Sequence, residues 1–545
     1  MKKFFQKNKI IIVLGLIVII AAFFRFWHLT QIPLGFNADE AAIGYNSWSI
    51  LNTGRDEFGN FLPVAFTSFG DFKPPLYIYL SIPSVAIFGL TEFAVRSPSA
   101  FFGVLTVIIT FFLTQELFGK FWISASAAFI LSISPWHIHY SRGGWETNLF
   151  TFLLTLGMYL FLKALKDKKF LYLSAFVFAL SFYSYQGARL VTPFLVMLLF
   201  LFFKSNLFKF KKHFIGSIFL GFLILLPAFY TFFTGAAFSR FSGVSIFADS
   251  GPFWQVNELR GQHTNPNSYL VQFIHNKVES YSIVALKNFS SHFGGDFLFI
   301  KGDPIPRNNI VGQGPLLLFS LPFLVLGSFF LLRNRSKFWF LPYILLLAAP
   351  SASALTFQSP QALRSASMVV PLAIIAGYGL YYSIFHLFNK KILLILFITF
   401  SGFLLVYSFS RFWYFYTVHN PQEIPIAFQP GFSELVPYVL KNKDNFEKVI
   451  VTDKYDQPYI LFLFYSKYNP QTFAKEAKLT PRDKFGFSTV RNFDKFEFRS
   501  INWSEDSKLK NVLIVGTAED IPQDIPSLKN ILFPNGSIAF KIVSR

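Results

Sequence analysis

The sequence predicts an α-helical polytopic membrane protein with about 11 spans, interfacial helices in its first outer loop and a small α/β domain at its C-terminal end. Three observations lead to this fold class. Hydrophobic residues make up 53% of the chain and charged residues only 14%, which gives a mean hydropathy of +0.45. Apolar runs of about 20 residues, the length that crosses a bilayer, recur up to residue 411. Beyond that point, strand-like and helix-like patterns replace them.

The first predicted span, 10–28, begins like a secretory signal because a basic segment precedes its apolar run. Phe23-Phe24-Arg25-Phe26-Trp27 follows where a small-residue cleavage site would stand, so we expect a retained helix. The other spans follow from the later apolar runs. We expect them at roughly 96–117, 120–136, 146–164, 170–187, 190–203, 213–233, 314–332, 338–355, 366–388 and 392–411.

The net charge of +20 belongs to the membrane part of the chain. Residues 1–412 hold 32 basic and 14 acidic residues, a balance of +18, whereas residues 413–545 hold 17 and 15, a balance of +2. The excess lies in short connectors, as the positive-inside rule requires of cytoplasmic loops. Nucleic acid is therefore not an expected partner, whereas membrane lipids are. The connectors are 166–169, 204–212, 333–337 and 390–391.

These basic connectors also predict the topology. If Pro75 to Leu90 were a span, a cytoplasmic N-terminus would place every later basic connector outside. We therefore expect this stretch to lie along the membrane surface as an interfacial helix. The first loop, 29–95, the long loop, 234–313, and the tail then lie on the outer face of the plasma membrane. The long loop is expected to form a wall on the acceptor side.

The tail, 413–545, is predicted to be a separate extracytoplasmic α/β domain, while 1–412 form the membrane domain. Lys448 to Asp453 and Asn511 to Gly516 have the pattern of buried strands. Phe432 to Asn442 and Asp456 to Ser466 have the pattern of helices. The tail contains no G-x-G-x-x-G motif, so we do not expect a nucleotide site there.

The candidate site begins with Asp39 and Glu40, adjacent acids just beyond the first span. Few acids occur in the membrane part, and this pair is followed in the same loop by Gly70-Asp71-Phe72-Lys73-Pro74-Pro75-Leu76-Tyr77. An acid and a cation beside the bilayer suggest a site that handles a proton and an anion together, as in group transfer from a lipid phosphate. The alternative is that both acids merely open a helix, where its dipole favours negative charge.

A third motif, Phe93-Ala94-Val95-Arg96-Ser97-Pro98-Ser99-Ala100, completes a pattern that resembles the C-type membrane glycosyltransferases. The chain is similar in pattern to the protein O-mannosyltransferases and to the aminoarabinose transferases that modify lipid A. The resemblance covers about residues 10–165, and Ser359 to Tyr378 is similar to the family's late outer loop and following helix. It implies transfer of a sugar from a polyprenyl-phosphate donor to a hydroxyl of a protein, glycan or lipid acceptor, on the outer face of the membrane.

The resemblance also implies roles for particular residues. Asp39 corresponds to the general base, with Glu40 in support, and adjacent helical residues diverge too far to act as the facing carboxylates of a double displacement. A single displacement with inversion is therefore expected. Lys73 corresponds to the family's lysine before two prolines and is expected to bind the donor phosphate. Its alternative role is to extend its ammonium to the headgroups.

Five further residues are expected to contact substrate. Asp71 stands one residue farther from Lys73 than the family's acid does, and Glu146 occurs one residue early at the start of the fourth span. Arg142 is either a substrate ligand or an interfacial anchor. The remaining two are Tyr77 and Arg364, the latter as a second phosphate ligand or an anchor.

We expect no metal and no cofactor, because the chain has no D-x-D motif and no cysteine, and His137 and His139 diverge on a helix. Two other functions remain open. A transporter or lipid flippase tends to place charges at mid-membrane, whereas the predicted spans have almost uncharged centres. A receptor or assembly scaffold built on the tail would not depend on Asp39.

Overall fold

The computed structural model describes residues 2–233, 243–483 and 486–545. These residues form two compact units. The first contains 1–18, 106–137 and 150–408. The second combines 19–105 and 138–149 with 409–545. The second unit thus contains both the first outer loop and the tail, and the separate folding of 413–545 stays a prediction.

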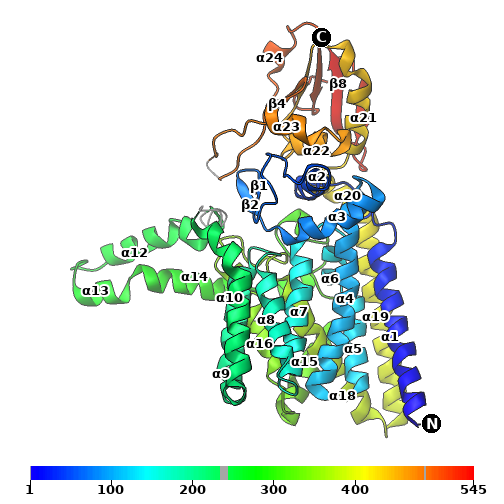
Figure 1. Ribbon diagram of the computed structural model, residues 1–545, viewed down its shortest axis with the longest axis vertical. Coiled ribbons are helices and arrows are strands. Elements are labelled where there is room, and N and C mark those ends of the chain that lie inside the picture. The colour runs from blue at the N-terminus through cyan, green and yellow to red at the C-terminus, as the bar shows by residue number, and fades with distance from the viewer. Residues whose placement is uncertain (1, 234–242, 484–485) are drawn as a thin grey trace. The chain divides into compact units, whose positions relative to one another are not determined.

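The first unit is helical, and its helices run side by side in Figure 1. Helix α18 packs against α5, α15 and α16, and α8 packs against α10. Glycines allow the closest approach in this packing: a Cβ on Gly327 would lie 2.0 Å from the Ile375 carbonyl oxygen of α18. The helices are α5 (Phe121–Ser132), α8 (Phe170–Ser181), α9 (Ala188–Lys209), α10 (Lys211–Phe233), α15 (Ser320–Asn334), α16 (Leu341–Ala348), α17 (Ser351–Ala354), α18 (Val369–Leu387) and α19 (Lys391–Tyr414).

Besides α19, which continues past residue 408 into the second unit, four more helices have residues in both units: α1 (Lys2–Phe26), α4 (Glu92–Phe118), α6 (Pro135–Ser141) and α7 (Glu146–Ala164). Among the described residues, six helices are long and apolar enough to span a membrane, or seven if the bent pair α5 and α6 is one span. Shorter apolar helices occupy the other predicted positions, at Ile10–Phe26, Phe170–Ser181, Ser320–Asn334 and Leu341–Ala354. The polytopic helical class is confirmed, and the total of about 11 spans stays a prediction.

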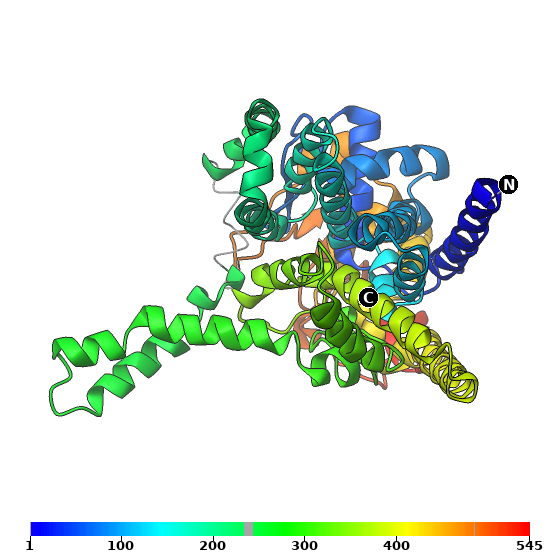
Figure 2. The same cartoon turned by 90° about the horizontal axis from the view of Figure 1, so that it is seen from below.

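The long loop, 234–313, is largely helical in its described part, and its acceptor-side role stays a prediction. Residues 234–242 lie outside the described residues. From 243 onward, α12 (Gly251–Gly261) and α14 (Lys277–Ser291) pack along each other and are joined by α13 (Tyr269–Ile274). Figure 2 shows this helical hairpin in green. Ser268 and Asn276 are the N-caps that start α13 and α14, and the side chain of each accepts a hydrogen bond from a backbone N–H of the first turn.

The hairpin is followed by short elements that lead back to the spans. These are the π-helix η2 (Asp296–Ile300) and the 3-10 helix η3 (Pro306–Asn308). Another 3-10 helix, η1 (Ile246–Ala248), comes before the hairpin. A further 3-10 turn, η4 (Ala366–Met368), leads into α18.

The second unit begins with the first outer loop. Helix α2 (Ala38–Thr53) packs against α3 (Leu76–Phe88), and the strands β1 (Phe66–Ser68) and β2 (Asp71–Lys73) form an antiparallel hairpin between them. The 13 residues of α3 span about 20 Å, too short for a hydrocarbon core of about 30 Å. Helices of similar length occupy some predicted span positions, so the interfacial assignment of Pro75 to Leu90 stays a prediction.

The C-terminal part of the second unit is the predicted α/β structure (Figure 1). Its six-stranded sheet has the order β4-β5-β3-β6-β8-β7, with β3 parallel to both β5 and β6. The predicted strands and helices are confirmed as β3, β6, α21 and α22. The strands are β3 (Lys448–Val451), β4 (Asn492–Phe493), β5 (Phe496–Phe498), β6 (Val512–Gly516), β7 (Lys529–Leu532) and β8 (Ile538–Ser544).

Helices complete this part of the chain. Helix α21 (Phe432–Asn442) packs against α22 (Pro458–Ser466), and α22 in turn packs against α2 of the first loop. The other helices are η5 (Phe415–His419), α20 (Asn420–Glu423), η6 (Pro425–Phe428), η7 (Lys443–Asn445), α23 (Pro470–Glu476) and α24 (Trp503–Asp506). The buried core includes β3 and β6, whose Val and Ile side chains are shielded from solvent.

Candidate active site

The start of helix α2 is fixed by a reciprocal cap. Asn37 is the N-cap, and its side-chain oxygen accepts from the Glu40 backbone N–H at 3.1 Å. The Glu40 carboxylate in turn accepts from the Asn37 backbone N–H, which completes a capping box. Gly54, at φ +69°, ends the helix in the left-handed conformation. Asp39 and Glu40 therefore do lie in the first turn, as the helix-start alternative requires.

Glu40 also forms a buried ion pair. The Nε of Arg96 donates to Glu40 Oε1 at 2.8 Å, and NH2 donates to Oε2 at 3.0 Å. The side chains are 0% and 1% exposed, so this bidentate pair lies away from solvent. Arg96 also donates to the carbonyls of Leu29 and Pro33. The pair therefore ties α2 to α4 and to the segment that follows the first helix.

The same glutamate holds the loop before α7. Glu40 Oε1 accepts from the Gly144 backbone N–H at 2.8 Å, and a Cβ on Gly144 would lie 3.3 Å from Glu40 Cγ. Asn148 fixes the loop from the other side, because its side-chain amide donates to the Ser99 carbonyl at 2.7 Å. Glu146, the first residue of α7, is thus brought into the unit that contains Asp39 and Lys73.

Asp39 points elsewhere, to Lys73. The lysine Nζ lies 2.6 Å from Asp39 Oδ1, and the side chains are 9% and 26% exposed, respectively. Lys73 ends strand β2, where it is paired with Phe66 of β1, and its ammonium also lies 5.8 Å from the centre of the Phe69 ring. The hairpin thus presents the cation, and the helix start presents a carboxylate that remains partly accessible.

The tail contributes to the position of α2. Gln429 Oε1 accepts from the Ala38 backbone N–H at 2.8 Å, and the Tyr45 hydroxyl donates to the Tyr468 carbonyl at 2.8 Å. Gly44 permits the close packing on α22, because a Cβ there would lie 2.6 Å from the Phe464 ring. The α/β structure is therefore packed directly behind the helix that bears Asp39.

The other sequence-predicted residues of this unit are placed as follows. The Tyr77 hydroxyl is buried and donates to the Val95 carbonyl at 2.9 Å. Asp71 is half-buried at the start of β2, where it is paired with Ser68. The buried Arg142 donates to the carbonyls of Phe24, Trp27, His28 and Ile32, which favours its anchoring alternative over a substrate contact.

Arg364 belongs to the first unit, so its proximity to Asp39 stays a prediction. Its charge lowers the pKa of Asp303, although burial, the larger effect, raises that pKa to about 6. Asp303 Oδ2 accepts from the Ala362 backbone N–H at 2.6 Å. Nearby, burial lowers the pKa of His292 to about 4, and its Nε2 accepts from the Gln361 N–H at 3.2 Å. This histidine is therefore neutral at physiological pH.

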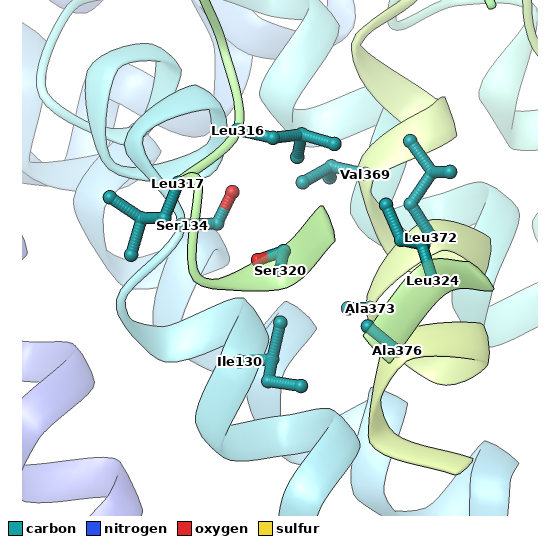
Figure 3. Close-up of a pocket in the computed structure, with 10 residues that line it drawn as sticks. All are labelled: Ile130, Ser134, Leu316, Leu317, Ser320, Leu324, Val369, Leu372, Ala373 and Ala376. Carbon is teal, nitrogen blue, oxygen red and sulfur yellow. The ribbon is translucent and has the colours of Figure 1, made fainter. Parts of the chain in front are cut away.

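A small cavity in the first unit does not match the predicted chemistry. Its volume is about 10 Å³, and Figure 3 shows apolar side chains around it with the hydroxyls of Ser134 and Ser320. None of the described residues that line it is titratable. Likewise, the described part of the chain contains no group of three His, Asp or Glu residues suited to hold a metal ion. Metal independence stays a prediction.

Two residues near the site carry no assigned role in the sequence analysis. Arg96 is part of the third motif, and an arginine at a span end could have indicated the buried partner of one of the two acids. Glu57 is fully buried, and its carboxyl is held by Asn46 of α2. Its sequence signal is a second adjacent acid pair, Asp56-Glu57, in the same loop as Asp39 and Glu40.

Comparisons with known proteins bear on the class of this fold. The resemblance to the C-type membrane glycosyltransferases is confirmed, and the chain has their fold. Residues 72–230 match the family described as dolichyl-phosphate-mannose-protein mannosyltransferase. That segment includes Lys73 and Arg96 but begins after Asp39.

Among curated proteins, the chain is 27% identical over 176 residues to the "Putative mannosyltransferase YkcB" of Bacillus subtilis (strain 168). The match covers 32% of this chain and 23% of the relative, so less than a quarter of that protein is represented. Among solved structures, ArnT from Cupriavidus metallidurans bound to undecaprenyl phosphate is similar over 97% of both chains, with 11% identity and a TM-score of 0.53.

A second structure has the same fold. The oligosaccharyltransferase AglB from Archaeoglobus fulgidus, in complex with an inhibitory peptide and a dolichol-phosphate, is similar over 85% of this chain and 64% of its own. The identity is 14% and the TM-score is 0.52. The neighbours bear lipid phosphates, and their low identity limits the comparison to the fold.

Proposed function

We propose that this protein is a membrane glycosyltransferase that moves a sugar from a polyprenyl-phosphate donor to an acceptor hydroxyl. The observation that supports it most is the Asp39–Lys73 pair, in which a carboxylate and an ammonium lie 2.6 Å apart at the start of helix α2. Transfer from a lipid phosphate needs one group that accepts a proton and one that neutralises an anion. This pair supplies both.

In the proposed reaction, Asp39 accepts the proton of the acceptor hydroxyl. The hydroxyl oxygen forms a bond to the anomeric carbon, and the bond from that carbon to the phosphate oxygen breaks. Its electron pair leaves on the phosphate. Glu40 cannot supply a second displacement, because Arg96, Asn37 and Gly144 engage its carboxylate. One displacement inverts the configuration at the sugar carbon.

Lys73 is the proposed ligand of the donor phosphate. An ammonium has three N–H donors, so it can pair with Asp39 and still donate to a phosphate oxygen. Arg364 is proposed as a second phosphate ligand, and Asp71, Tyr77 and Glu146 as residues around the substrate. As charge develops on the departing phosphate, contacts to a fixed ammonium strengthen, and the reaction is accelerated.

The printed names of the family and of the curated relative indicate a mannosyl group as the first sugar to test. The peptide in one neighbour's title and the lipid phosphates in both suggest a protein, glycan or lipid acceptor at the membrane. Comparison of lipid-linked sugars and envelope glycans in cells with and without the protein tests this directly. The expected result is accumulation of one polyprenyl-phosphate sugar and loss of one glycan.

The proposal requires the site to face outward. Positive-inside loops predict a cytoplasmic N-terminus in the plasma membrane and an extracytoplasmic tail. Labels at Asn52 and Ser500 should then react from outside, whereas a label at Lys168 should react only after permeabilisation. Outside labelling at Lys168 would overturn this topology.

Purified protein in lipid nanodiscs tests the chemistry. Transfer from polyprenyl-phosphate mannose to an acceptor extract should occur, and Asp39→Asn should abolish it while donor binding persists. Movement of the intact lipid across vesicles without transfer would favour the flippase alternative.

A further inference from the structure

Glu57 lies in the loop between α2 and β1 and has no role in the proposed reaction. The residue is fully buried, and one carboxyl oxygen, Oε1, accepts from the Asn46 side-chain amide at 3.3 Å. The Glu57 backbone N–H donates back to Asn46 Oδ1 at 3.0 Å. The other carboxyl oxygen, Oε2, has no hydrogen-bond partner among the described residues. A buried carboxyl left half unsatisfied needs an explanation.

The attachment to α2 places this carboxyl on the same side of the helix as the site. Asn46 follows Asp39 by seven residues, about two turns, so both project from one face of α2. Asn46 is itself fixed, because its amide also donates to the Ala42 carbonyl at 2.9 Å. Glu57 is therefore held along the face that presents Asp39 to Lys73.

Several elements contribute groups that face Glu57. The charge of Lys73, on β2, lowers the pKa of Glu57. Asp56 precedes it, while Tyr45 of α2 and Tyr459 of α22 are close enough for its charge to raise the pKa of each hydroxyl. The Tyr459 hydroxyl is buried and, among the described residues, has no hydrogen-bond partner. Little around Glu57 favours its charged form.

We propose that Glu57 is a positioning residue that must be neutral for the site to bind the donor phosphate. This inference rests on the proposed function. With Glu57 neutral, Asp39 and Lys73 together sum to zero charge, and an anion can approach the ammonium. With Glu57 ionised, the same three groups sum to −1 and repel a phosphate. The second carboxylate also attracts the Lys73 ammonium away from the ligand.

Burial supplies the neutral form at physiological pH. It raises the pKa of Glu57 to about 8, and the charge of Asp56 raises it further, whereas the Asn46 hydrogen bond and the charge of Lys73 lower it. Below pH 8 the carboxyl is therefore mostly protonated. Above pH 8 it ionises, and affinity for a lipid phosphate should fall. The alkaline limit of binding would thus be set by a residue that does not touch the ligand.

The test is the pH dependence of binding of undecaprenyl phosphate to the full chain in nanodiscs. For the wild type we expect the Kd to rise roughly tenfold between pH 7 and pH 9, the order of one charge-assisted contact. Glu57→Gln keeps the shape but cannot ionise, so its Kd should lack the part of the rise that Glu57 causes. Ionisation of the lipid phosphate itself is common to both proteins and cancels in the comparison.

Glu92→Gln is the matched control. It makes the same exchange at a half-buried glutamate that accepts from the Tyr465 hydroxyl and lies outside the groups that face Glu57. This variant should follow the wild type. If Glu57→Gln shows the wild-type pH dependence, the inference is wrong while the proposed function stands. If the wild type binds the lipid at no pH, the proposed donor fails and the inference with it.

A second variant covers the case in which Glu57→Gln does not fold. Asn46→Ala removes the hydrogen bond that lowers the pKa of Glu57, so the alkaline midpoint of binding should move to higher pH. An unchanged midpoint would contradict the inference. A purely structural Glu57 would change the amount of folded protein without moving this midpoint.

Discussion

The first turn of α2 holds two adjacent acids in contrasting surroundings. Glu40 and Arg96 form a pair that is at most 1% exposed, with further hydrogen bonds to the backbone around it. Asp39 and Lys73 form a pair in which the carboxylate is 26% exposed. Both pairs have short contacts, yet only the second leaves a carboxylate that an acceptor can reach. Accessibility, and not the presence of an ion pair, separates a candidate catalytic acid from a structural one.

The largest effect is expected from breaking the buried pair. Arg96→Ala leaves the Glu40 carboxylate buried without its cation, and loss of one partner of a buried pair typically costs about 3–5 kcal/mol of folding free energy. Thermal unfolding of the purified variant should show a strongly lowered Tm or no folded protein. A variant with wild-type Tm would mean that the Glu40–Arg96 pair does not have the structural role that separates Glu40 from Asp39.

Removing the acid of the Asp39–Lys73 pair should instead affect the rate of the chemical step. Asp39→Asn removes the proposed base with little change in volume, and loss of a positioned base lowers rates by about 10²–10⁴. The turnover number should fall by this factor, while the Tm and donor affinity stay close to wild type. The matched control is Asp71→Asn in the neighbouring hairpin, which should retain more activity. Near-normal turnover of Asp39→Asn would leave only the helix-start role.

Removing the cation of the Asp39–Lys73 pair should affect both donor binding and turnover. Lys73→Ala and Arg364→Ala each remove a proposed charge-assisted contact to phosphate, so donor affinity should fall about 10-fold or more. The Lys73 variant should also have a lower single-turnover rate, because the contact strengthens as the phosphate departs. If both variants keep wild-type affinity and rate, the two cations are membrane anchors and the phosphate is held elsewhere.

The sequence predicted the elements better than their contacts. Apolar runs and strand patterns identified the helical class, α21, α22, β3 and β6, because burial dictates local periodicity. The helices of 251–291 were not predicted, since they expose much apolar surface and lack a clear periodic pattern. Leu270, Phe273 and Val278 are 67%, 80% and 77% exposed, respectively.

The site shows the same limit. Adjacency in the sequence indicated that Asp39 and Glu40 share a helix start, but it could not indicate which acid faces Lys73 and which faces Arg96. That choice depends on contacts between residues 34 and 56 positions apart, set by the hairpin and by α4. The role of Gln429 as a partner of the α2 backbone was equally invisible, because 391 positions separate the two groups.

The smallest predicted effect concerns stability, and it places a third acid in the comparison. The pKa of Glu57 is raised from 4.5 to about 8 in the folded protein, so between these values the folded state binds a proton that the unfolded state has lost. The folded state binds more protons, and its stability therefore decreases as pH rises through this window. Glu57→Gln removes this dependence. The stability of the variant relative to wild type should thus increase by on the order of 1–3 kcal/mol between pH 5 and pH 7. Denaturant unfolding at both pH values measures the difference. A constant difference would mean that Glu57 is ionised in the fold, and the charges of Asp39 and Lys73 would then have a permanent third charge beside them.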